Sequence, residues 1–204
     1  MKEKQLWIVI LAAGRSSRMG RPKQLLPVHG KSMLRHAVTT ALASGEQHVA
    51  VVAADDGKVT SELTAGLPIQ WFINEHPEEG LSSSIRAGLK ALMQEHRPEA
   101  VMFLLADQPE LQHQVIAAAA QAYRSTKSPI VQVKYRDRPG HPVIFDQSMF
   151  QQLLQIDGDQ GAKEVITKNR DCIRWVEVDS EMPQDVDTPE EYEACIERIN
   201  RLDR

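Results

Sequence analysis

The segment LAAGRSSRMGRPKQLLP, at 11–27, combines small residues with positive charge directly after an apolar run. Small side chains at 12–14 allow the backbone to approach a ligand closely, and successive N–H groups in a glycine-containing turn form a concavity that binds anions. Arg15, Arg18 and Lys23 add formal positive charge. A triphosphate requires both hydrogen-bond donors and cations, so this segment predicts a polyphosphate site.

Two familiar phosphate loops do not explain the segment. The dinucleotide-binding pattern G-x-G-x-x-G is absent, because Gly14 and Gly20 are too far apart for it. Residues 30–32, GKS, end like a Walker A motif, but Leu25 stands where that motif requires glycine. We therefore predict that 30–32 form a turn that opens the next helix.

Acidic residues in two later segments are candidates for a metal site. Asp107 follows the apolar run 101–105, and one carboxylate with phosphate oxygens and waters is a normal magnesium site. An aspartate here can equally cap a helix or stabilise a turn. Asp187 offers a second carboxylate, with Asp185 two residues before it. The local alternative is stronger there, because Thr188 precedes a proline and fits a helix N-cap.

Two further motifs contain polar side chains at predicted element ends. Residues 79–89, EGLSSSIRAGL, include Gly80 and Ser84. Their serines either cap the helix that follows or form hydrogen bonds to the edge of a base. His141 lies within GHPV at 140–143, where the adjacent proline is compatible with a simple turn histidine.

Apolar runs that alternate with helical patterns must position these residues. We predict strands at Leu6–Leu11, Val49–Ala53, 69–73, 101–105, Ile130–Lys134, 143–145 and 173–178. We predict helices at 32–44, 56–65, 82–95, 112–123, 149–154, 162–168 and 189–201. This alternation indicates an α/β, Rossmann-like three-layer sandwich with a mainly parallel, twisted sheet. Ligands bind beyond the carboxyl ends of such strands, so the residues after the first, third and fourth strands are the best candidates for a site.

The composition sets limits on the class of protein. A chain of 204 residues suits one domain, 1–204. The net charge of −4 argues against a nucleic-acid surface, and the lack of an 18-residue apolar run argues against a membrane span. The first apolar run leads into Gly14 and Arg15 rather than a cleavage site, so we predict a strand and not a signal peptide. With Cys172 and Cys195 expected to be buried and reduced, we predict a cytoplasmic protein.

Together these segments resemble the MobA-like nucleotidyltransferase family, whose signature loop is L-A-A-G-x-S-x-R-M-G-x-x-K-x-L-L-P. They recur in family order from residue 6 to about 193. Within the family, the chain is most similar to the molybdenum cofactor cytidylyltransferases. It has Ala-Ala-Gly at 12–14, where guanylyltransferase relatives have Ala-Gly-Gly, and the motifs at 107–109 and 140–143 are typical of this branch. The resemblance implies a fold like that of the nucleotide-diphospho-sugar transferases.

The resemblance also implies an activity. Such proteins transfer CMP from CTP to the terminal phosphate of molybdopterin, release pyrophosphate, use Mg²⁺ and serve enzymes of the xanthine dehydrogenase type. The alternatives are a guanylyl- or other nucleotidyltransferase with a different phosphorylated acceptor, and a non-catalytic protein that delivers the cofactor to a client molybdoenzyme. Nucleic acid and membrane partners are not implied.

Individual roles follow from the resemblance, position by position. Lys23, Arg18 and Asp107 would be catalytic. Asp107 would bind magnesium, with Asp187, or else Asp185, as a second ligand. His141 would lie on the acceptor side. The nucleotide-binding residues would come from the loop after the first strand and from the segment after the third, namely Leu11, Ala12, Ala13, Gly14, Arg15, Lys23, Gly80 and Ser84.

Overall fold

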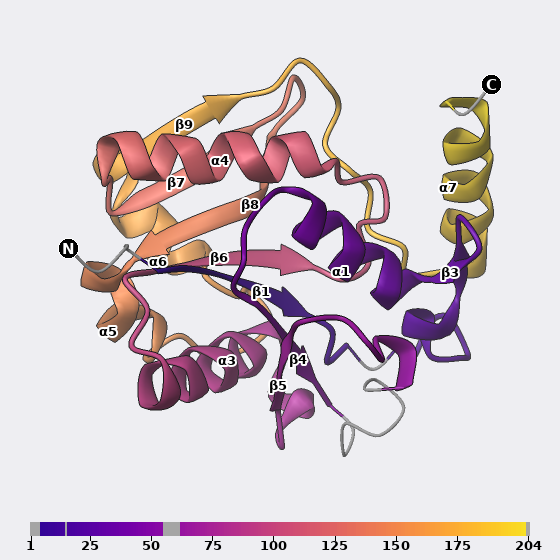
Figure 1. Ribbon diagram of the computed structural model, residues 1–204, viewed down its shortest axis with the longest axis horizontal. Coiled ribbons are helices and arrows are strands. Elements are labelled where there is room, and N and C mark those ends of the chain that lie inside the picture. Colours follow the sequence, from indigo (N-terminus) through magenta and orange to yellow (C-terminus); the bar gives the residue numbers. More distant parts are fainter. Residues whose placement is uncertain (1–4, 15, 55–61, 203–204) are drawn as a thin grey trace.

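The computed structural model describes residues 5–14, 16–54 and 62–202. Their central element is a seven-stranded sheet (Figure 1). The strand order is β5-β4-β1-β6-β8-β7-β9. Among these strands, β8 alone runs antiparallel to its neighbours, which confirms the prediction of a mainly parallel sheet. The strand bounds are β1 (Leu6–Leu11), β4 (Val49–Ala53), β5 (Gln70–Ile73), β6 (Ala100–Leu105), β7 (Ile130–Lys134), β8 (Pro139–Asp146) and β9 (Ile173–Glu177).

Helices cover both faces of the sheet, as predicted for a three-layer sandwich (Figure 1). One face packs against α1 (Met33–Ala43) and α4 (His113–Thr126), and the other packs against α3 (Leu81–Glu95), α5 (Phe150–Leu153) and α6 (Lys163–Lys168). Side chains of β1 alternate between the two layers. Ile8 and Ile10 join the first core cluster, whereas Trp7 and Val9 join the second. Burial on both faces explains why β1 is a continuous apolar run.

A separate cluster anchors the loop that follows β1. Met19, Leu26 and Met33 pack against Cys195 and Ile199 of the last helix, α7 (Pro189–Leu202). The Tyr192 hydroxyl of α7 also donates a hydrogen bond of 2.7 Å to the Pro27 carbonyl oxygen. The C-terminal helix therefore holds the charged N-terminal loop in place.

A short hairpin joins this loop to α1. Its strands are β2 (Pro27–Val28) and β3 (Lys31–Ser32), and the turn between them has positive φ at His29 (47°) and Gly30 (72°). The Ser32 hydroxyl then accepts a hydrogen bond of 3.2 Å from the Arg35 N–H and caps α1. As predicted, Gly30 lies in a turn and Ser32 opens the next helix, but Lys31 and Ser32 also pair with β2 as a short strand.

The strand β8 begins four residues earlier than the predicted 143–145. Its N-terminal part contains two prolines, which the sequence pattern assigns to a turn. The ladder to β7 pairs Gln132 with Val143 but Val133 with Gly140, so a bulge places His141 and Pro142 out of register. A bulge is one of the few positions in a sheet that tolerate proline.

Two other predictions concern the helix at 56–65 and the burial of the two cysteines. The predicted helix 56–65 falls mostly on residues outside the described ranges. Cys195 is buried as expected, but Cys172 is exposed in the short 3-10 helix Arg170–Cys172, so that part of the prediction was wrong. No helix in the described part of the chain is long and apolar enough to cross a membrane.

Candidate functional site

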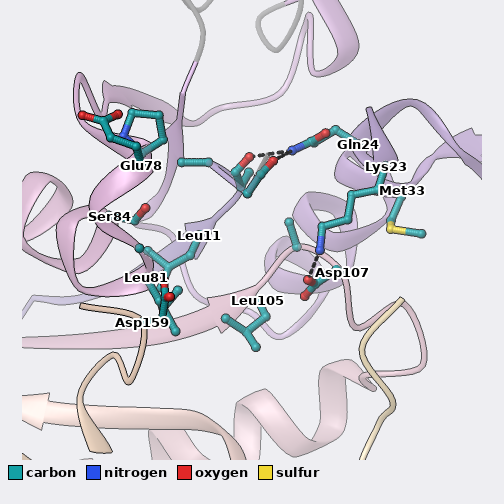
Figure 2. A pocket seen from close by; sticks show the side chains of 16 residues that line it. Leu11, Lys23, Gln24, Met33, Glu78, Leu81, Ser84, Leu105, Asp107 and Asp159 are labelled. Atoms are coloured by element: carbon teal, nitrogen blue, oxygen red, sulfur yellow. Dashed lines mark hydrogen bonds and ion pairs between the residues drawn. The ribbon is translucent and has the colours of Figure 1, made fainter. Parts of the chain in front are cut away.

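A cavity of about 300 Å³, here called the loop cleft, opens at the carboxyl ends of β1 and β6 (Figure 2). Its walls come from the end of β1 and the residues after it (11–14), from Lys23, from Asp107 after β6, and from Gly80 and Ser84 around the start of α3. The helices α1 and α3, which follow β1 and β5, lie on opposite faces of the sheet. Such a change of face creates the crevice in which open α/β sheets bind ligands.

Lys23 is the centre of an ion cluster beside this cleft. Its ammonium group donates hydrogen bonds to Asp107 Oδ2 and, at 2.9 Å, to Asp187 Oδ1 (Figure 2 shows the Asp107 contact). The other Asp187 oxygen accepts a hydrogen bond of 2.7 Å from the Arg18 guanidinium. Three segments far apart in sequence thus place two carboxylates and two cations together.

Hydrogen bonds within the loop orient Lys23. Its backbone N–H donates to the Ser16 hydroxyl at 3.1 Å. The neighbouring Gln24 side chain donates to the carbonyl oxygens of Ala12 (2.8 Å) and Gly14 (3.2 Å). Gln24 therefore fixes the backbone that lines the cleft, a role that we did not predict. Arg15 lies outside the described residues.

The segment before α7 places Asp187 opposite Lys23. The Val186 N–H donates a hydrogen bond of 3.0 Å to the Asp107 carbonyl oxygen, which ties this segment to the end of β6. Thr188 caps α7 by accepting from the Glu191 N–H at 3.2 Å, and Glu191 accepts in return from the N–H groups of Thr188 and Asp187. Thr188 is thus the cap, as the local alternative proposed, and the Asp187 carboxylate remains directed at Lys23.

Asp185 makes a different contact from Asp187. Its carboxylate accepts a hydrogen bond of 2.8 Å from the Gln108 amide. Asp107 is likewise not a helix cap, since the first residue of α4 is His113. Of the two later carboxylates, Asp187 is the one that shares a lysine with Asp107.

Burial and ion pairing act against each other in this cluster. Burial alone would lower the pKa of Lys23, but contacts with Asp107 and Asp187 outweigh burial and raise it. Burial raises the pKa of the Asp107 carboxyl in spite of Lys23. Partial burial would also raise the pKa of Asp187, but Lys23 and Arg18 hold it below its ordinary value. Asp107 is therefore the carboxylate whose charge is least compensated.

The donor set fits a divalent cation whose coordination is completed by substrate. Asp107 Oδ1 is buried and has no hydrogen-bond partner among the described residues. The same residues contain no group of three or more His, Cys, Asp or Glu side chains suited to a metal. Two carboxylates without a full protein cage are typical of magnesium sites that also use phosphate oxygens and water.

The start of α3 forms the opposite wall of the loop cleft. Gly80 has a φ of 87°, a conformation that residues with a side chain rarely adopt, and a Cβ atom there would also lie 2.9 Å from the Gly158 carbonyl carbon. The hydroxyls of Ser83 and Ser84 accept hydrogen bonds of 2.8 and 3.0 Å from the Asn74 amide, just after β5. These serines are therefore held by a side chain beyond β5, and Ser84 also faces the cleft.

His141 lies in a second cavity, of about 780 Å³, here called the sheet cleft. It extends over β7, β8 and β9 toward α6 and adjoins the loop cleft through Leu81 and Leu105, which line both. His141 Nδ1 lies 3.2 Å from the Phe103 carbonyl oxygen. A carbonyl oxygen only accepts, so Nδ1 carries the proton and Nε2 is the acceptor nitrogen. Burial lowers the pKa of His141, which favours this neutral form.

Comparisons with known proteins agree with this architecture. The family described as "MobA-like NTP transferase domain" matches residues 8–173. The chain is 29% identical to nicotine blue oxidoreductase of Paenarthrobacter nicotinovorans, over 90% of this chain and 92% of that protein. It is 28% identical to purine catabolism protein PucB of Bacillus subtilis (strain 168), over 95% and 97% of the two chains.

The chain also superposes closely on solved structures. The crystal structure of Rv0371c from Mycobacterium tuberculosis H37Rv superposes with a TM-score of 0.85 at 28% identity, covering 97% of this chain and 100% of that one. A structure of the same protein in complex with manganese superposes with a TM-score of 0.81, over 95% and 98% of the two chains. The chain therefore belongs to the family of MobA-like NTP transferase domains.

Proposed function

We propose that this nucleotidyltransferase moves CMP from CTP to the terminal phosphate of molybdopterin and releases pyrophosphate, in the maturation of a xanthine dehydrogenase-type enzyme. The main observation in support is the buried Lys23, held between two carboxylates at the edge of the loop cleft. A nucleotidyl transfer brings two anions together, so it requires charge neutralisation and in-line alignment. Cations and carboxylates are the groups that such a reaction needs.

The nucleotide half of the reaction fits the loop cleft. In this proposal the backbone at 12–14 and Lys23 bind the phosphates, with Arg18 adding charge at the exposed side. The side chains that surround the base in this proposal are those of Leu11, Ala12, Ala13 and Ser84, together with Gly80. Lys23 and the loop N–H groups then stabilise the charge that develops on the α-phosphate and on the departing pyrophosphate.

The acceptor half needs no general base. A phosphate monoester is already largely ionised near neutral pH, so its oxygen can attack the α-phosphate without a side chain that removes a proton. We propose that the phosphorylated substrate, molybdopterin, lies in the sheet cleft. There the Nε2 atom of neutral His141 accepts a hydrogen bond from it. The shared walls at Leu81 and Leu105 bring its phosphate end toward the nucleotide.

Asp107 and Asp187 are the residues that would hold a divalent cation, which we propose to be Mg²⁺. The manganese complex of Rv0371c supports a divalent cation in this fold. When bound, such a cation supplies Lewis acidity to the phosphate oxygens. Arg18 and Lys23 hold Asp187 in position for this role.

Base selection gives a prediction at Ala13, which is buried in the wall of the loop cleft. Its methyl group narrows the cleft relative to glycine, and guanine is larger than cytosine. We expect Ala13→Gly to raise kcat/KM for GTP relative to CTP by about tenfold, the scale of one methyl-sized change in a pocket. The measurement is turnover with each nucleotide. Ala65→Gly, an exposed alanine away from the cleft, is the control, and an unchanged CTP/GTP ratio in Ala13→Gly would reject this role.

The direct test of the proposed function is pyrophosphate release by the purified protein with Mg²⁺ and molybdenum-loaded molybdopterin, with CTP, GTP, ATP and UTP supplied separately. We expect release with CTP. Release with GTP instead would indicate a guanylyltransferase. No release while CTP still binds would indicate another phosphorylated acceptor or a protein that delivers the cofactor to its client.

The name of one relative, nicotine blue oxidoreductase, is a weaker guide to the function of this chain. This chain lacks the G-x-G-x-x-G loop of nicotinamide dinucleotide sites.

A further inference from the structure

One row of side chains that lines the sheet cleft crosses four strands. Register pairs Phe103 of β6 with Val143 of β8, Val143 with Gln132 of β7, and Gln132 with Trp175 of β9. All four residues line the sheet cleft. Three of them are apolar, so Gln132 is the polar member of this row.

Gln132 is an unusual residue for its strand. It lies in β7 (Ile130–Lys134), where the neighbouring residues are buried and apolar, and its side chain is only 8% exposed. Its carboxamide oxygen is buried and has no hydrogen-bond partner among the described residues. Buried polar groups in proteins are almost always hydrogen-bonded. An unpaired amide that lines a cavity therefore indicates a partner supplied by a ligand.

Gln108 repeats this feature at the end of the cleft nearest the carboxylates. It is 3% exposed and lines the sheet cleft. Its amide nitrogen donates to Asp185 at 2.8 Å, which fixes the orientation of the side chain because a carboxylate only accepts. The carboxamide oxygen is then left buried without a partner among the described residues. The sheet cleft thus contains two side-chain oxygens, those of Gln108 and Gln132, that have no hydrogen-bond donor among the described residues.

His141 adds a third acceptor to the same cleft. Its Nδ1–H is used by the Phe103 carbonyl oxygen, which leaves Nε2 as the acceptor nitrogen. The bulge in β8 puts this residue beside the Gln132–Val143 pair. Trp175, 37% exposed at the outer end of the row, offers a flat apolar surface. The cleft therefore combines a stacking surface with acceptors that require hydrogen-bond donors.

We propose that the sheet cleft selects a planar heterocycle that carries N–H donors, and that Gln132, assisted by Gln108, is the residue that determines this specificity. The choice of a pterin as the probe rests on the proposed function. The recognition itself rests on the unpaired oxygens and the exposed indole. A sugar or polyol phosphate would also offer donors, but it lacks the flat face that Trp175 would cover.

The test compares two free pteridines by equilibrium fluorescence titration of the full chain. Pterin has N–H donors at its 2-amino group and N3, whereas 1,3-dimethyllumazine has none. We expect the protein to bind pterin at least about tenfold more tightly, the scale of one or two hydrogen bonds. Gln132→Met, which keeps length and removes the amide, is expected to lose most of this preference while its affinity for CTP is unchanged. Gln121→Met, an exposed glutamine on α4 at the other face of the sheet, should keep the preference.

The outcomes separate this inference from the proposed function. Equal affinity for the two pteridines, or an unchanged preference in Gln132→Met, would overturn the inference even if CMP transfer to molybdopterin were observed. A preference for pterin that Gln132→Met abolishes would support it even if no CMP transfer occurred. If Gln132→Met does not fold, Gln108→Met provides the same comparison, and an unchanged preference in that variant would then overturn the inference.

Discussion

Asp107→Asn is expected to lower kcat for nucleotidyl transfer by about 10²- to 10³-fold, the scale seen when a preorganised electrostatic group is removed from an active site. Asparagine has nearly the same volume, so the wall of the loop cleft is kept. The charge is lost from the carboxylate that accepts from Lys23 and whose second oxygen is buried without a partner among the described residues. Pyrophosphate release under saturating CTP and acceptor measures the effect.

A second readout separates a chemical role of Asp107 from a structural one. We expect Asp107→Asn to keep its circular dichroism spectrum, since Lys23 retains its contact with Asp187, while manganese binding in the presence of CTP is lost. Asp179→Asn is the matched control, because Asp179 is almost fully exposed and its ion pair, with Arg136 at 3.4 Å, lies on the surface. Near-normal turnover in Asp107→Asn would contradict the proposed catalytic role of Asp107.

The sequence predicts those parts of the fold and site that depend on local patterns. The continuous apolar run of β1 followed by small and basic residues indicates a strand that leads into an anion site, and the loop cleft forms there. Asp107 was identifiable for the same reason, because it follows a buried strand of the same sheet. A residue at the carboxyl end of a parallel strand is placed by the strand itself.

Contacts that depend on distant packing could not be predicted in this way. Asp187, one of the two partners of Lys23, is 164 residues away in the sequence. The two residues meet because α7 packs on the loop through Cys195 and Ile199. Sequence alone therefore left Asp185 and Asp187 as alternatives. Gly80 has a φ of 87° and lies against the backbone of Gly158, which comes from a loop with no periodic pattern.

The region around β8 was not predicted correctly for a different reason. Two prolines within 139–142 are typical of a turn, and the structure instead uses a bulge to include them in the sheet. Pro139, Gly140 and His141 of this irregular part of β8 line the sheet cleft. A sequence signal for the cleft does exist in Gln132, a single polar residue inside a buried apolar strand, but its meaning depends on the register that pairs it with Val143 and Trp175.

Lys23→Met is expected to have two effects of opposite sign. It should lower kcat/KM for CTP by about 10²- to 10³-fold, because the variant loses the buried cation that we propose to contact the phosphates. It should also tighten manganese binding in the absence of nucleotide by at least about tenfold. The lysine ammonium lies between Asp107 and Asp187, the carboxylates that we propose to hold the metal. Two unit positive charges about 4 Å apart repel by roughly 4 kcal/mol even at an effective dielectric constant near 20, and the double charge of Mn²⁺ doubles this repulsion.

Calorimetric titration of the nucleotide-free protein with Mn²⁺ distinguishes this arrangement from a purely structural lysine. Lys31→Met is the control, since Lys31 is exposed in β3 and outside the ion cluster. If Lys23 only stabilises the fold, its loss should weaken manganese binding together with activity. If the ammonium and the metal share the two carboxylates, affinity for the metal rises while turnover falls. In that case the nucleotide phosphates would give Lys23 an alternative partner, so that CTP and the divalent cation would bind cooperatively to the wild-type protein.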